Sequence, residues 1–351
     1  MHTPINTPRG KLMEQYVLLR IMSLTGVDLN LFQFDRHNAL YFFMMNADEH
    51  IYIRYGGRDA ASATTYLDFD SLELALAQGL ELHTRYQAGN FEPQERQEPL
   101  YPKDILTLKK SVIDNNRCVE CHLVDDYLIT EMETAGTLDK LQDMYASPDL
   151  HTLGIYLDIP RGLQIDRTER AATAAGLQRG DIITHLGNHA VYTFGDLQFR
   201  LDRVHRRSTE LPIGINRDGS AMTVVMALPD QWWFTDLTHR YWSVDPLVFF
   251  NAERLSTEEK QTLDLPVDGF ASRVIEVDIN ALLEGAHDLE EGDIIVAVDG
   301  VEQNIITQDL VTHIKLMHTA GNTKTLTILR GDEIQEMPLT SKRQRYRKRG
   351  N

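Results

Sequence analysis

The chain has 351 residues, of which 42% are hydrophobic and 25% charged, and its formal net charge is −17. This length suits two or three domains, and the composition excludes a wholly disordered chain, a collagen-like repeat and a disulfide-rich scaffold. An acidic protein repels nucleic acid and anionic membranes, so we expect no nucleic-acid partner. No apolar run reaches the roughly 18 residues of a membrane helix, and no export leader is visible, which predicts a cytoplasmic protein as the sequence is written.

The first predicted domain, residues 11–90, reads as strand, connection, hairpin and helix. Residues 14–22 (EQYVLLRIM) are expected to form a buried strand or a short helix. Residues 39–45 (ALYFFMM) are a continuous apolar run, typical of a strand covered on both faces, and 51–55 (IYIRY) alternates, so the two predict a hairpin. A helix is expected over 71–86 because its apolar residues recur at helical spacing.

A linker and a short helical segment are predicted next. Residues 88–102 hold three prolines and many charges, which indicates a linker. The segment 103–150 carries both cysteines of the chain, with helices expected over 105–115 and 125–135. These helices would flank the motif at 118–122 (CVECH).

The remainder of the chain contains an internal repeat. Residues 177–183 (LQRGDII) match 289–295 (LEEGDII), 112 residues later. Each copy is expected to have the same elements in the same order: a short helix (171–175 and 279–284), the matching segment, a strand, a glycine turn, an amphipathic helix (193–204 and 307–318) and two final strands. A repeat of a whole unit predicts two domains of one fold, at 151–230 and 250–340. The basic residues 341–351 are expected to be a disordered tail.

The first copy resembles the PDZ domains attached to bacterial high-temperature-requirement proteases. The resemblance rests on 171–183 (Ala-Ala-x-Ala-x-Gly-Leu-x-x-Gly-Asp-Ile-Ile) and on 187–191 (GNHAV). It implies that 153–156 (LGIY) opens a peptide-binding strand whose backbone amides capture a C-terminal carboxylate. In the second copy the matching segment would lie near 267–270, where the charge of Asp268 would oppose an anionic ligand.

This resemblance implies that protein or peptide C-termini bind by strand addition to a sheet edge. The helix at 193–204 would form the other wall of the groove, with two leucines four residues apart on one face. The predicted peptide-binding residues are Leu153, Gly154, Ile155, Leu157, Leu197 and Leu201. A PDZ fold used only as a packing or dimerisation module is the alternative.

Most of the chain also resembles a bacterial family that joins a thioredoxin-like region to PDZ domains, some of whose members are selenoproteins. The residues that carry this resemblance are 28–35 (DLNLFQFD), 41–48 (YFFMMNAD) and 52–58 (YIRYGGR). The strand and helix that bear the thioredoxin dithiol have no counterpart before Glu14. We therefore expect a multidomain α+β protein: a partial thioredoxin-like α/β unit, a short helical CxxCH segment and two PDZ-like β-barrel or sandwich domains.

The CxxCH motif is the attachment signature of c-type haem. Cys118 and Cys121 would form thioethers with the haem vinyl groups, and His122 would be the axial ligand of the iron. The candidate sixth ligands are Met132, Met144 and His151. A dithiol/disulfide switch, a zinc or other metal site and structural thiols are the alternatives. Because haem c is attached outside the cytoplasm, it would imply a periplasmic protein whose true start lies upstream.

Two functions are consistent with these features. The first is a tandem-PDZ binding and scaffold protein with covalent haem c, which passes electrons to a redox partner protein or senses redox state. The second is a haem-free PDZ adaptor with a thiol/disulfide switch at its two cysteines. We do not expect an enzyme, because the sequence has no Gly-x-Ser-x-Gly nucleophile motif, no protease domain and no intact thioredoxin dithiol.

Overall fold

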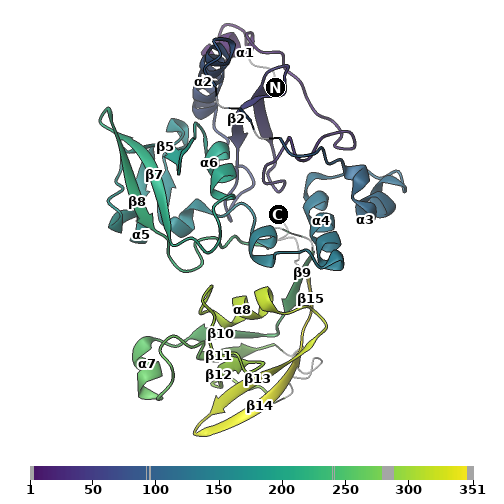
Figure 1. Ribbon diagram of the computed structural model, residues 1–351, viewed down its shortest axis with the longest axis vertical. Coiled ribbons are helices and arrows are strands. Elements are labelled where there is room, and N and C mark those ends of the chain that lie inside the picture. The colour runs from purple at the N-terminus through teal and green to yellow at the C-terminus, as the bar shows by residue number, and fades with distance from the viewer. Residues whose placement is uncertain are drawn as a thin grey trace. The chain divides into compact units, whose positions relative to one another are not determined.

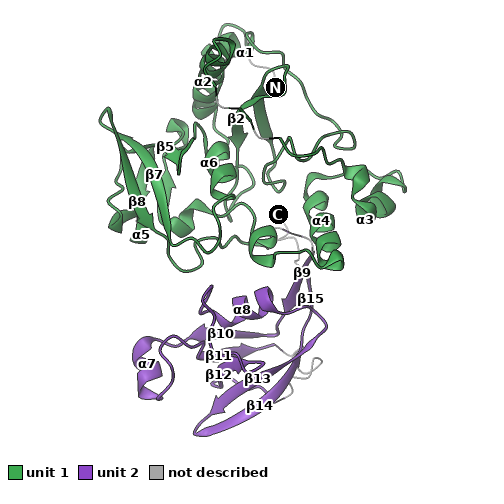
Figure 2. Cartoon of the chain, in the orientation of Figure 1, with its two compact units in different colours: residues 1–239 green, residues 240–351 purple. Residues whose placement is uncertain are grey.

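The structure is a computed structural model that describes residues 4–91, 93, 94, 96–238, 240, 242–278 and 288–345, with only the backbone of Trp242. The chain divides into two compact units, residues 1–239 and 240–351 (Figure 2). Both units combine helices with small antiparallel sheets, none of which closes, in agreement with the expected multidomain α+β class. No helix in the described ranges is long and apolar enough to cross a membrane.

The predicted N-terminal hairpin and helix are confirmed. The elements of this part are α1 (Pro8–Met13), β1 (Tyr41–Met45), β2 (Ile51–Gly56) and α2 (Phe69–Gln87). β1 and β2 pair antiparallel from Tyr41–Gly56 to Met45–Ile51. The side chain of Asp68 caps α2 by accepting the N–H groups of two residues in its first turn. Ile53 packs with the buried leucines of α2.

The prediction of a buried strand or helix at 14–22 is wrong. These residues form no helix or strand beyond the end of α1, and Val17 and Leu19 are 89% and 88% exposed. Tyr16 is tied to α2, because its hydroxyl donates to the carbonyl of Leu76 at 2.6 Å. The neighbouring core is formed by the hairpin and α2. The apolar side chains of Val17 and Leu19 therefore stay exposed, although their composition favours burial.

The segment that carries the cysteines is helical, as predicted. Its elements are η1 (Pro102–Asp104), α3 (Leu106–Leu108), η2 (Lys109–Ile113), α4 (Cys121–Ala135), η3 (Lys140–Met144) and η4 (Leu150–Leu153). Ile105, Leu108 and Val124 bury themselves together, with Leu29 from the N-terminal part of the chain in the same cluster. This shared core joins the segment to the first domain.

The two copies of the repeat follow along the chain (Figure 1). The first copy consists of β3 (Ile155–Leu157), η5 (Ile159–Arg161), β4 (Ile165–Thr168), α5 (Arg170–Ala174), β5 (Ile182–Leu186), β6 (His189–Ala190), α6 (Phe194–Leu201), β7 (Glu210–Arg217) and β8 (Ser220–Ala227). The second consists of β10 (Phe250–Arg254), α7 (Thr257–Thr262), β11 (Ser272–Val277), β12 (Ile294–Val298), α8 (Leu310–Met317), β13 (Thr323–Arg330) and β14 (Glu333–Thr340). The strand orders are β6-β5-β7-β8 with β3-β4 in the first copy and β10-β11-β12-β13-β14 in the second.

Matching ion pairs confirm that the two copies are equivalent. In the first copy Arg217 Nε lies 2.7 Å from Asp181 Oδ1, and in the second Arg330 Nε lies 2.7 Å from Asp293 Oδ1. Both aspartates lie in the repeated Gly-Asp-Ile-Ile motif, and each also accepts a backbone N–H from three residues earlier. In both copies, therefore, an arginine at the end of the first strand of the final hairpin binds the aspartate of the Gly-Asp-Ile-Ile turn through two N–H groups.

The first copy packs tightly on the N-terminal hairpin through α6 and β2. A Cβ atom on Gly195 would lie 2.3 Å from the carbonyl oxygen of Arg54, so only glycine allows this approach. The Arg54 N–H donates to Asp196 Oδ1 at 2.9 Å, and the Thr193 hydroxyl donates to the Arg54 carbonyl. These contacts explain why the hairpin and the first copy belong to one compact unit.

The basic tail is ordered further than expected. Residues Lys342–Arg345 form β15, which pairs antiparallel with β9 (Trp242–Leu247) in the second unit, so the prediction of disorder from residue 341 is wrong. The hydrogen bonds between paired strands are made by the backbone, so a strand of basic residues can still pair. Charged side chains such as lysine are common on edge strands. The helix expected at 279–284 lies outside the described residues.

Candidate functional site

The CxxCH motif lies at the start of α4. Cys118 is exposed in the preceding loop, Cys121 is the first residue of the helix, and both are free thiols. Burial raises the pKa of the Cys121 thiol above its usual range, which lowers its reactivity. The His122 ring lies 3.5 Å from a carboxylate oxygen of Glu120.

The three candidate sixth ligands lie in different surroundings. Met132 lies ten residues further along the same helix, a rise of about 15 Å, which is too far for both side chains to reach one iron. Met144 is 1% exposed, and His151 stacks on the ring of Tyr156 at 4.6 Å. The described residues contain no group of three metal-binding side chains. Haem c and the thiol switch both stay predictions.

Covalent haem has a direct test. The protein would be expressed with an added export leader and the cytochrome c maturation machinery. If haem attaches, its mass should rise by about 616 Da and a Soret band should survive acid-acetone extraction. The Cys118→Ala and Cys121→Ala double variant is the control. A colourless product of unchanged mass would exclude haem attachment and leave the thiol chemistry.

The predicted peptide-binding residues of the first copy belong to its core. Leu153, Leu197 and Leu201 are each 1% exposed, and Ile155 is fully buried. Leu157 is half-buried at the end of β3. Other side chains therefore cover these four residues in the first copy, and their role in peptide binding stays a prediction.

Gly154 has the left-handed backbone conformation that glycine favours. Its φ is +77°, and a Cβ atom would lie 2.1 Å from the carbonyl oxygen of Glu169. Its N–H, however, donates to the carbonyl of His151 at 3.0 Å. This amide is therefore engaged within the chain, and it does not point at a ligand.

The counterpart of β3 in the second copy is β10, and the prediction of 267–270 is wrong. Glu169 N–H donates to the Gly154 carbonyl at 2.8 Å, and Asp278 N–H donates to the Phe249 carbonyl at the same distance. In each case the donor directly follows the second strand of the pair and the acceptor directly precedes the first. The strand register thus equates Phe249 with Gly154.

Residues 267–270 instead belong to the connection between α7 and β11. The buried Lys260 of α7 donates through Nζ to the carbonyls of Val267 and Gly269, at 3.0 and 2.6 Å. Asp268 therefore stands in this inserted connection and not at the start of the peptide strand. The electrostatic objection to an anionic ligand in the second copy no longer applies to β10.

β10 is the edge strand of its sheet, and among the described residues it pairs with β11 on one side only. Phe250 pairs with Val277, and the bond from Asp278 to Phe249 flanks this pair. The pair is therefore of the non-hydrogen-bonded type, so the N–H and C=O of Phe250 point away from β11. In the part of the sheet that the structure describes, no strand lies on that side.

Helix α8 packs beside β10 and presents an apolar side chain. Thr193 caps α6 and Asp309 caps α8, each accepting an N–H three residues later. Aligning the two caps equates the buried Leu201 with Met317, which is 58% exposed. Val248 and Phe249 are half-buried at the start of β10. The second copy thus places an edge strand beside a helix, with one exposed and two half-buried apolar side chains.

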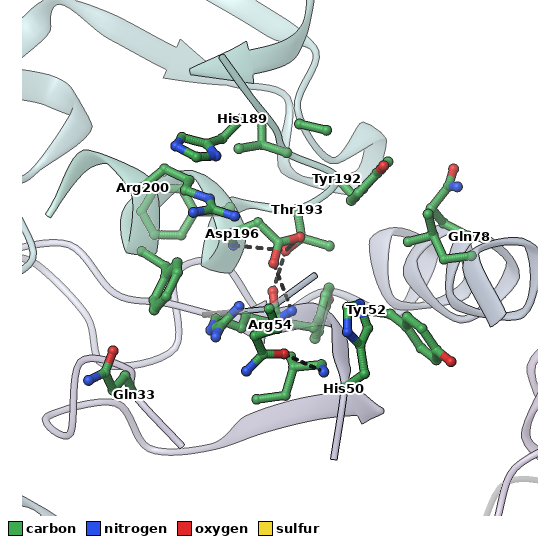
Figure 3. A pocket seen from close by; sticks show the side chains of 18 of the residues that line it. Gln33, His50, Tyr52, Arg54, Gln78, His189, Tyr192, Thr193, Asp196 and Arg200 are labelled. Carbon is green, nitrogen blue, oxygen red and sulfur yellow. Dashed lines mark hydrogen bonds between the residues drawn. The ribbon is translucent and has the colours of Figure 1, made fainter. Parts of the chain in front are cut away.

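A cleft of about 1310 Å³ lies in the first unit, between the N-terminal hairpin and the first copy (Figure 3). Arg54 on β2, Arg200 on α6 and Arg203 just after it all line the cleft. Burial raises the pKa of Asp196, between them, to about 6. The sequence patterns did not predict that these residues lie together. The available signals were an arginine inside the apolar strand at 51–55 and the arginines that follow Phe199 along the helix.

Comparisons with known proteins do not assign a family. No family model and no curated protein matches the chain. Among solved structures it is similar to the HtrA-type protease AlgW with a decapeptide (12% identity, 48% of this chain, 57% of that chain, TM-score 0.25) and with a tripeptide (15%, 49%, 56%, 0.27). It is also similar to an aminopeptidase N family protein from Idiomarina loihiensis (19%, 28%, 14%, 0.21). The chain spans about half the length of the AlgW chains, and these TM-scores are too low to carry an argument.

Proposed function

We propose that this chain is a PDZ-like peptide-binding scaffold protein whose second copy captures an extended peptide by strand addition to β10. The observation that supports this most strongly is the free edge of β10 beside α8, with the N–H and C=O of Phe250 directed outward. An incoming peptide would gain backbone hydrogen bonds along that edge, which supply affinity irrespective of sequence.

Selectivity would come from the apolar groups next to the edge. Met317 is exposed on α8, and Val248 and Phe249 are half-buried at the start of β10. Methionine adapts its shape to different apolar partners, which suits a surface that accepts several peptides. We therefore expect a preference for apolar side chains near the end of the bound peptide.

The first copy would serve as a packing module in this proposal. Its helix α6 is held against β2 by Asp196 and Thr193, and the leucines expected to line its groove are covered. The duplication would thus have separated two roles: the first copy builds the N-terminal unit, and the second binds the partner.

Binding can be measured on the full chain with fluorescently labelled peptides that end in apolar residues. Anisotropy titrations should give dissociation constants of about 1–100 μM, as is usual for backbone-dominated strand addition. Met317→Glu places a charge on the groove and should weaken binding at least about tenfold, whereas Met317→Leu should keep it. Because Met317 is exposed, neither change should unfold the protein. Equal binding by the two variants, or no binding of any peptide at millimolar concentration, would refute the proposal.

A further inference from the structure

Strand β8 is an edge strand of the sheet in the first copy (Figure 1). The strand order is β6-β5-β7-β8, so among the described residues β8 pairs with β7 on one side only. The sequence of β8 (SAMTVVMA) contains no charged residue, no proline and no glycine, and its pairing with β7 has no bulge. Edge strands of soluble proteins usually carry such features, because an unprotected edge pairs readily with another strand. β8 has none of these protections.

The register shows which backbone groups of β8 point away from β7. Leu228 N–H donates to the Thr209 carbonyl at 2.8 Å, which makes a hydrogen-bonded pair directly beyond the last pair of the two strands. Because hydrogen-bonded and non-hydrogen-bonded pairs alternate, every second residue of β8 directs its N–H and C=O towards the free edge. These residues are Ala221, Thr223, Val225 and Ala227. All four are exposed, although α5 packs beside β8.

The equivalent strand of the second copy, β14, has a protected edge. The hairpins β7–β8 and β13–β14 have the same register counted from their turns, so Thr223 corresponds to Glu336 and Val225 to Pro338. The carbonyl opposite Pro338 accepts the Asp299 N–H at 2.8 Å from the other side of β13, so Pro338 faces the free edge as well. A proline there offers no N–H to a further strand, and a glutamate adds charge. The two copies share the hairpin, but only the first leaves its edge open to pairing.

We propose that β8 pairs antiparallel with β8 of a second copy of this chain and so forms a two-fold symmetric dimer. In such an interface the same surface patch is used by both subunits, so a charge on the strand would lie close to its own copy and oppose pairing. The net charge of −17 makes two copies of the chain repel each other. An interface between copies is therefore most favourable where the strand itself carries no charge, as β8 does.

One register uses all four outward-facing residues. If the two-fold axis passes through Val224, Thr223 opposes the partner's Val225, and the outermost of the four residues oppose one another. Each opposed pair then exchanges two backbone hydrogen bonds, about eight in all. Thr223 and Val225 are both β-branched and form a favourable cross-strand pair. The apolar side chains of Met222 and Val225, 43% and 55% exposed, would be partly covered by the partner.

The test is sedimentation velocity of the full chain at concentrations from about 1 to 500 μM and near-physiological salt. We expect the average mass to rise from 40.1 kDa towards twice that value, with a dissociation constant of about 10–100 μM because the interface is small. Thr223→Glu and Val225→Pro place the residues of β14 on β8 and should each weaken association at least about tenfold. Neither variant removes a hydrogen bond to β7, so urea unfolding should stay close to that of the wild type.

A matched control uses the same added charge on the protected edge. Ile334→Glu lies on β14, where the side chain is 72% exposed, and it should associate like the wild type. Met317→Glu, which is expected to weaken peptide binding, should also leave dimerisation unchanged. The dimer proposal and the peptide proposal concern different strands, so either one can fail without the other.

A charge exchange tests whether β8 meets its own copy. In the proposed register the two copies of residue 223 are diagonal neighbours, within reach of long side chains. Thr223→Glu and Thr223→Lys should each associate weakly alone, whereas their equimolar mixture should associate at least about threefold more tightly than either. A monomer at every concentration, equal association of Thr223→Glu and the wild type, or a mixture no tighter than its components would each overturn the proposal.

Discussion

Gly195→Ala should separate α6 from β2 and lower the stability of the first unit by about 2–4 kcal/mol. The new Cβ atom would lie 2.3 Å from the Arg54 carbonyl oxygen and 2.5 Å from the Tyr41 hydroxyl. A backbone carbonyl cannot move aside cheaply. Relieving the clash would also break the hydrogen bonds that Thr193 and Asp196 make with Arg54.

Urea denaturation of the full chain, followed by hydrogen exchange of β2 and α6, measures this effect. Gly26→Ala is a suitable control, because a Cβ atom there meets nothing within 4 Å. The control should unfold like the wild type, whereas Gly195→Ala should lose protection in β2 first. Identical unfolding curves for Gly195→Ala and the wild type would show that α6 and β2 do not pack as described.

Acidification should destabilise the second unit through His313. This residue is 3% exposed on α8, and its Nδ1 accepts a hydrogen bond from Asn304 Nδ2 at 2.9 Å. Its ring lies 4.5 Å from Phe270 and 5.7 Å from His318. Burial, with a smaller contribution from His318, lowers the pKa of His313 from 6.5 to about 4, and Asp299 opposes the shift only weakly.

The folded state favours the neutral form of His313, so protonation of this side chain favours unfolding. Stability from this group is complete above pH 6.5, where His313 is neutral in both states, and it is lost as the pH falls towards 4. The loss should reach up to about 3 kcal/mol. Hydrogen exchange of α8 and β10 between pH 7.5 and 4.5 would measure it.

His313→Leu provides the matched control, because the equivalent helix position in the first copy is Leu197. The variant cannot titrate at this position, so its second unit should keep the same stability across this pH range apart from the contribution of other groups. If the wild type and the variant lose stability equally between pH 6.5 and 4, His313 is not the responsible group.

The duplicated fold was predictable because its signal is local. The Gly-Asp-Ile-Ile turn needs a glycine at positive φ, and Gly180 and Gly292 have φ values of +94° and +97°. Such a requirement lies within a few consecutive residues, so it survives in a single sequence. The hairpin at β1 and β2 was predictable for the same reason, since the strand pattern and the turn are adjacent.

The position of β10 was not predictable by counting residues. The first copy joins its initial strands through a short connection, whereas the second inserts α7 between β10 and β11. The predicted segment, 267–270, lies inside this insertion. Only the strand register, with Phe249 in the place of Gly154, reveals the equivalence.

The grouping of Arg54, Asp196 and Arg200 in the cleft depends on contacts that no local pattern encodes. Arg54 and Asp196 are 142 residues apart, and they meet because Gly195 allows α6 to approach β2 closely. The apolar run at 14–22 failed for a related reason. Apolar composition shows that a segment prefers burial, but it does not specify which surface, if any, will receive it.

The peptide-binding claim is tested most directly by the backbone amides of β3 and β10. The isotopically labelled full chain would be titrated with an apolar C-terminal peptide and followed by two-dimensional amide NMR. The outward-facing N–H of Phe250 should shift with increasing peptide, while that of Ile155, in the equivalent position of the first copy, should not. Shifts at Ile155 without any at Phe250 would place the peptide in the first copy and contradict the account.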